Sequence, residues 1–156
     1  MKKLEMILIA GAIIGFVLAL LNVPYHSAIV SVFLLPLGVL YLYLGFALLN
    51  DIPFTKIFKP ESYQGIGTGR ILLAVGTGIG ISQLTVGFLF TVNNYPMTRS
   101  FLSFGLVVSA LMLLLALIRN STEKHRFYMN IALRCAGFII LGIISLVVYA
   151  QQGQPA

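Results

Sequence analysis

Acidic residues are scarce in this chain of 156 residues, which holds four Asp and Glu residues, one cysteine, two histidines and no tryptophan. A single cysteine, Cys135, excludes an internal disulfide. His26 and His125 lie far apart, and the sequence shows neither a metal-ligand spacing nor a nucleophile with a neighbouring base. We therefore expect no enzymatic activity and no bound cofactor.

Apolar residues dominate instead, because 59% of the chain is hydrophobic, 9% is charged and the mean hydropathy is +1.00. Soluble domains carry about 25% charged residues, so this composition predicts a single integral membrane domain over residues 1–156. Five apolar runs each approach the ~20 residues that a helix needs to cross a bilayer. They lie at roughly 5–22, 27–49, 71–92, 100–118 and 127–149. The expected fold is an all-α membrane protein with five transmembrane helices.

Basic residues predict the orientation. Eight of the ten Lys and Arg residues fall on one side if every run crosses: Lys2, Lys3, Lys56, Lys59, Arg70, Arg119, Lys124 and Arg126. The positive-inside rule then places the N-terminus in the cytoplasm and the C-terminus in the periplasm of a bacterial inner membrane. Because these charges flank the runs, the net charge of +6 indicates contact with anionic lipid, and no nucleic-acid partner is expected.

The first apolar run follows two lysines, as the start of a cleavable signal peptide does. Glu5 at the start of the run, and the lack of a clean small-x-small cleavage motif before Asn22, favour a retained membrane span.

A shift of 72 residues aligns residues 15–24 with residues 87–96 without a gap. The identical pairs are Gly15/Gly87, Phe16/Phe88, Asn22/Asn94 and Pro24/Pro96, and Ser31/Ser103 continues the register. Short turns often contain Asn and Pro for local reasons, but the matched glycines favour a duplication. The predicted organisation is a hairpin at 5–49, an inside loop at 50–70, a second hairpin at 71–118 and a fifth helix at 127–149. The repeated turn residues Asn22, Pro24, Asn94 and Pro96 would lie on the outside.

Small residues recur one helical turn apart in the first and third runs. Gly11 and Gly15 form one Gly-x-x-x-Gly face, and Gly76 and Gly80 form another. Such faces let two membrane helices approach closely. Because they occur in the two matched helices, we expect the first and third helices to meet at an axis along the membrane normal.

Arg134 is the one charged residue well inside an apolar run. It lies eight residues beyond Arg126, about 12 Å along a helix, with Asn130 one turn before it on the same face. A charge at that depth is costly and marks either a functional site or a structural arginine that snorkels toward the inside boundary or pairs with a carboxylate. If Arg134 is functional, it could bind an anion, bind a lipid headgroup or act as a coupling residue. We favour an ion pair with Glu5.

Gln83 lies near the middle of the third run. Membrane helices most often use such a side chain for an interhelical hydrogen bond, worth on the order of 1 kcal/mol. A polar lining of a transport pathway is the alternative.

Several short motifs resemble a known group of proteins. They are Gly87-Phe88-Leu89-Phe90 ending in Asn94-Tyr95-Pro96, Leu44 to Asn50, Phe54 to Phe58, and Ser62-Tyr63. Together they resemble small membrane proteins of Bacteroidota that are similar to the membrane hairpin of the gliding-motility protein GldL, a stator-like motor subunit. The resemblance implies the hairpin fold. The lysine positions of the GldL pattern hold Ala19 and Thr91 here, so it does not imply the motor chemistry. A weaker likeness is to duplicated-hairpin proteins of the acid-stress membrane type.

The sequence therefore favours a small non-catalytic scaffold or accessory subunit. It would act through helix contacts with further copies of itself or with another membrane protein, and its other expected partner is the lipid bilayer. The alternative is a small transporter or ion-conducting subunit with a polar site at Arg134 and Gln83.

Overall fold

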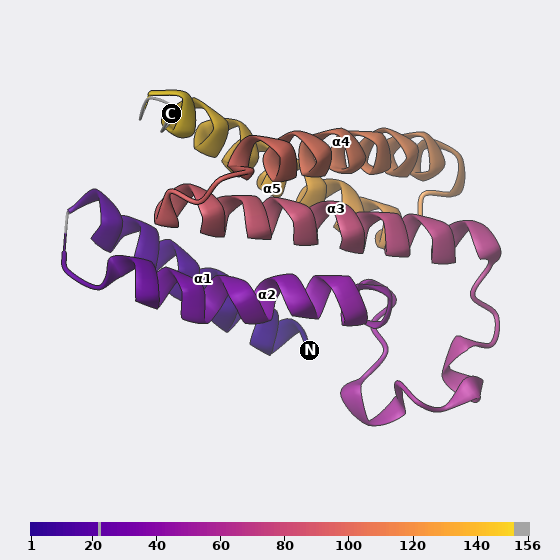
Figure 1. The fold of residues 1–156 in the computed structure, drawn as a ribbon. Coiled ribbons are helices and arrows are strands. Elements are labelled where there is room, and N and C mark those ends of the chain that lie inside the picture. The colour runs from indigo at the N-terminus through magenta and orange to yellow at the C-terminus, as the bar shows by residue number, and fades with distance from the viewer. Residues whose placement is uncertain (22, 152–156) are drawn as a thin grey trace.

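The computed structural model describes residues 1–21 and 23–151, and in these residues all regular secondary structure is helical, without a strand (Figure 1). The α-helices are α1 (Lys2–Leu20), α2 (His26–Leu49), α3 (Thr68–Asn93), α4 (Thr98–Glu123) and α5 (Arg126–Gln151). Two short 3₁₀ helices, η1 (Phe54–Lys56) and η2 (Pro60–Tyr63), lie between α2 and α3. Asn22, one of the four predicted turn residues, lies outside the described residues. The prediction of an all-helical fold is confirmed.

Four of these helices, α2 to α5, are long and apolar enough to cross a membrane. Backbone amides and carbonyls have no water to bond in a bilayer, so such apolar runs must form helices that satisfy their own hydrogen bonds. The prediction of a membrane protein is therefore supported for these four segments. A crossing by α1 remains a prediction.

Consecutive helices run antiparallel, and α3 occupies the middle of the bundle (Figure 1). It packs on α2 along one side and on α4 and α5 along the other, while α1 packs on α2. Two ends of the bundle result. The turn end carries the short α1–α2 and α3–α4 connections. The loop end carries residue 1, the segment between α2 and α3, and the α4–α5 connection.

The glycine face of α1 packs on α2, so the prediction that α1 and α3 meet through their glycine faces is wrong. A methyl group on Gly15 would lie 2.6 Å from a side-chain carbon of Val30, and one on Gly11 would lie 2.3 Å from the ring of Phe33. Both neighbours belong to α2. Because a short turn returns α2 antiparallel beside α1, α2 fills the smooth face that the glycines create.

The glycine face of α3 is filled in the same way by the helix that follows it. A methyl group on Gly80 would lie 2.7 Å from the hydroxyl oxygen of Ser109, and one on Gly76 would lie 2.5 Å from the sulfur of Met112. Both contacts are with α4. Each glycine face therefore closes its own hairpin and does not join the two hairpins.

A different pair of glycines joins the two hairpins. Gly45 of α2 and Gly78 of α3 lie where these helices cross, and a methyl group on Gly45 would be 3.1 Å from the Cα of Gly78. A methyl group on Gly78 would lie 2.6 Å from the carbonyl oxygen of Tyr41. The sequence analysis missed this crossing. Its signal was the alternation of glycines at 76, 78 and 80, which places Gly78 on a different face from the other two.

Candidate functional site

Arg134 and Glu5 form a two-armed ion pair inside the bundle. Nε of Arg134 donates to Oε1 of Glu5 at 2.8 Å, and Nη2 donates to Oε2 at 2.8 Å. The planar guanidinium matches the two carboxylate oxygens, which makes this the strongest geometry for such a pair. Glu5 is only 4% exposed. The pair joins the first helix to the last across 129 residues of sequence.

Tyr41 completes this cluster from α2. Its hydroxyl donates to Oε1 of Glu5, and the whole residue is fully buried. A buried tyrosine hydroxyl needs a hydrogen-bond partner, and the carboxylate provides one. The sequence analysis missed Tyr41, although a tyrosine in the middle of an apolar run was a usable signal. We call Glu5, Tyr41 and Arg134 the buried triad.

The other polar residues considered from the sequence are not hydrogen-bonded to the buried triad in the part of the chain that the structure describes. Within the described part of the chain, neither Asn130 nor Gln83 has a hydrogen bond to Arg134 or Glu5. Both are partly exposed on their helices. The structure therefore brings Arg134 and Glu5 together, but it does not assemble the four residues into one polar site.

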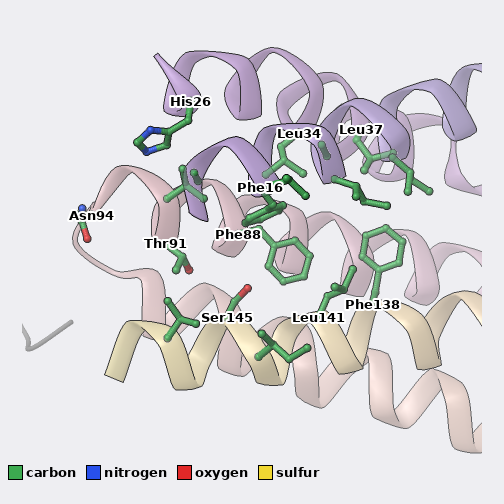
Figure 2. Close-up of a pocket in the computed structure, with 18 residues that line it drawn as sticks. Phe16, His26, Leu34, Leu37, Phe88, Thr91, Asn94, Phe138, Leu141 and Ser145 are labelled. Atoms are coloured by element: carbon green, nitrogen blue, oxygen red, sulfur yellow. The ribbon is translucent and has the colours of Figure 1, made fainter. Parts of the chain in front are cut away.

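A cleft of about 610 Å³ lies between α1, α2, α3 and α5 (Figure 2). Its volume falls in the range of about 300–1,000 Å³ that is typical of small-molecule sites. Most of its lining is aliphatic, with Phe16, Phe88 and Phe138 contributing aromatic rings. Its polar groups are His26, Thr91, Asn94 and Ser145.

Four aromatic rings connect the buried triad with the cleft. Tyr41 meets Phe138 edge-on with ring centres 5.6 Å apart, and Phe138 stacks on Phe88 at 6.4 Å. Phe88 in turn meets Phe16 at 6.4 Å. Aromatic pairs at these separations are favourable beyond their burial. This ladder links α2, α5, α3 and α1. Phe138, one turn beyond Arg134, lines the cleft and contacts Tyr41 of the buried triad.

The described residues contain no group of three or more His, Cys, Asp or Glu side chains that could hold a metal ion. Cys135 is a buried free thiol. The chemistry of the described site therefore consists of one internal ion pair and one apolar cleft with a few polar groups.

Comparison of the chain with models of protein families, with curated proteins and with solved structures found no significant match. The resemblance to the GldL hairpin consequently depends on the short motifs alone. The geometry of the buried triad and of the cleft carries the functional argument.

Proposed function

We propose that this chain is a five-span, non-catalytic scaffold or accessory subunit of a bacterial inner membrane. The observation that carries the proposal is the closed ion pair between Glu5 and Arg134. A charge inside a membrane bundle is a functional-site hypothesis by default. Here both oxygens of the Glu5 carboxylate accept hydrogen bonds from protein groups, so the triad joins α1, α2 and α5. A transport role for Arg134 and Gln83 has less support, because Arg134 is paired with Glu5 and no hydrogen bond joins it to Gln83 among the described residues.

The proposed orientation places the loop end in the cytoplasm. The eight flanking basic residues belong to the segments at or next to this end of the bundle (Figure 1). That asymmetry supports cytoplasmic retention and contact with anionic headgroups. With 19 residues, α1 is about 28 Å long, close to the ~30 Å of a hydrocarbon core. Since α1 packs along α2, a crossing by α2 supports a crossing by α1.

The two hairpin turns support the proposed duplication. Tyr25 and Met97, 72 residues apart, both adopt left-handed backbone angles, with φ of 66° and 68°. Each directly precedes the returning helix of its hairpin. A bulky residue with positive φ is uncommon, so the shared strain at matched positions favours a common origin for the two turns.

The glycine contacts repeat with the same offset. Gly15 packs on Val30, and Gly87 packs on Leu102. A methyl group on either glycine would lie 3.2 Å from the backbone nitrogen of that neighbour. Val30 and Leu102 are both fully buried. The duplication we propose is therefore of whole hairpins. It does not generate a closed twofold arrangement, because α2 packs on α3 whereas α1 and α4 have no comparable contact among the described residues.

Cysteine labelling tests the five-span topology. Cysteines introduced at Ser62 and Ser121 should be shielded from a membrane-impermeant thiol reagent in intact cells, whereas a cysteine at Ser27 should react. The native Cys135 is fully buried, so it should not react with the reagent and can stay in place. Permeabilised cells provide the control, because all three introduced cysteines should then react. Labelling of Ser62Cys in intact cells would overturn the proposed orientation.

Native mass measurement tests the scaffold role. After gentle solubilisation from its own membrane, the 17.0 kDa chain should remain associated with a second copy or with another membrane protein. Lipids that co-purify should be enriched in anionic species, because the basic residues lie at the loop end. A lone chain that retains no protein under the mildest conditions, yet moves a solute across vesicles, would support the transport alternative.

A further inference from the structure

The cleft opens between the matched faces of the two hairpins. Phe16 of α1 and Phe88 of α3 are equivalent under the 72-residue shift, and so are Ala19 and Thr91. All four line the cleft. Between these matched residues of α1 and α3 the structure has an apolar space that α2 and α5 help to enclose (Figure 2).

The cleft has the depth of one leaflet. Along α1 its lining runs from Ile9 to Ala19, about 15 Å of helix at 1.5 Å per residue. That is about half of the ~30 Å hydrocarbon thickness. The cleft therefore extends from the turn end, the periplasmic side in the proposed orientation, to the middle of the bundle.

Hydrocarbon is the natural occupant of such a space. Protein interiors are close-packed, so an unfilled cleft leaves its lining atoms without partners. Water is a poor filler, since it needs two to four polar partners and most of the lining is aliphatic or aromatic.

Polar groups line the turn end of the cleft. Nδ1 of His26 donates to the carbonyl oxygen of Val23 at 2.9 Å, which leaves Nε2 as an acceptor in the neutral ring. Asn94 lies at the same end, in the α3–α4 connection, and the hydroxyl of Ser145 lies on the cleft side of α5 (Figure 2). No charged residue lines the cleft in the part of the chain that the structure describes.

We propose that this cleft binds one hydrocarbon chain of an amphiphile with an uncharged, hydrogen-bonding head. The chain lies against Phe16, Phe88 and Phe138, and the head lies among His26, Asn94 and Ser145. An anionic head gains no cationic partner in this lining. The binding site is separate from the buried triad and does not depend on the scaffold role.

Photolabelling in proteoliposomes tests the site. A monoacylglycerol with a diazirine at the chain end should label peptides that contain the lining residues Phe16, Phe88 or Phe138. It should label the exposed face of α4 around Val107 far less. Ala19→Trp fills the cleft from α1 and should reduce labelling of the lining by about tenfold or more, because the loss of two buried methylene groups of the bound chain already corresponds to that factor.

Ala10→Trp is the matched control, since it places the same side chain on the exposed face of the same helix and should leave labelling unchanged. Ser145→Leu fills the cleft from α5 and decides the question if Ala19→Trp does not fold. Equal labelling of the lining and of α4, or labelling that persists in the filled variants, would overturn the proposal.

Two further probes with the same photoreactive chain test which class of lipid supplies the hydrocarbon chain in the cleft. A free fatty acid carries a carboxylate head, and a phospholipid represents bulk membrane. Both should label the lining less than the monoacylglycerol does at equal membrane concentration. Equal labelling by the fatty acid would contradict the uncharged head, and equal labelling by the phospholipid would show that bulk lipid fills the cleft.

Discussion

Arg134→Leu is expected to lower the free energy of unfolding by about 3–5 kcal/mol, the cost of leaving one member of a buried pair without its partner. The carboxylate of Glu5 would remain buried, and of the triad only the hydroxyl of Tyr41 would still donate a hydrogen bond to it. Unfolding in mixed micelles, followed by helical circular dichroism, measures the loss. Arg134→Lys should fall between wild type and leucine, because an ammonium cannot reproduce the two parallel hydrogen bonds.

A double-mutant cycle separates pairing from burial. Glu5→Gln in the Arg134→Leu background should restore part of the lost stability, because a neutral amide costs less to bury than an unpaired carboxylate. The Arg119–Glu123 pair, at 3.2 Å and exposed at the loop end, is the matched control. Arg119→Leu should cost less than about 1 kcal/mol, as exposed pairs usually do.

The opposite outcome would identify a ligand site. An Arg134→Leu protein with wild-type stability that has lost a co-purifying anionic lipid would contradict the structural role of the triad. In that case Glu5→Gln should rescue nothing, since the ligand would be the true partner of Arg134.

Gly78→Leu is expected to be the most damaging change at a helix contact, with a loss of about 3 kcal/mol or more from overpacking. The new side chain would begin 2.6 Å from the carbonyl oxygen of Tyr41, and a helix backbone cannot move aside as a side chain can. Because Tyr41 belongs to the buried triad, separation of α2 from α3 should also weaken the triad. Thermal unfolding in detergent measures the effect.

Two glycines provide the comparison. Gly76→Leu should cost less than Gly78→Leu, because the sulfur of Met112 that it meets belongs to a flexible side chain. Gly137 of α5 has no neighbour within 4 Å of a methyl group, so Gly137→Leu should leave stability nearly unchanged. If all three variants unfold at the same temperature, the assignment of the α2–α3 crossing is wrong.

Much of the fold could be predicted from local sequence. The positions of the helices follow from apolar runs bounded by charged or turn-forming residues, because a bilayer leaves an apolar segment no other way to satisfy its backbone. The ion-pair partner of Arg134 could also be predicted from the sequence. The chain has four acidic residues, and Glu5 is the one at the start of a span. The structure places that residue against Arg134.

The neighbours of each helix were decided only by the tertiary structure. Gly-x-x-x-Gly faces show that a helix surface is smooth, but they do not say which helix covers it. The short turns bring the hairpin partner to that face first, so the glycine faces of α1 and α3 do not meet. The cleft between them follows from that choice, and so does the Gly45–Gly78 crossing. Tyr41 joins the triad because α2 packs beside α1 and places the tyrosine hydroxyl within hydrogen-bond reach of Glu5. Sequence patterns indicate whether each helix surface is smooth, apolar or polar. Which surfaces pack against each other depends on the packing of all five helices together.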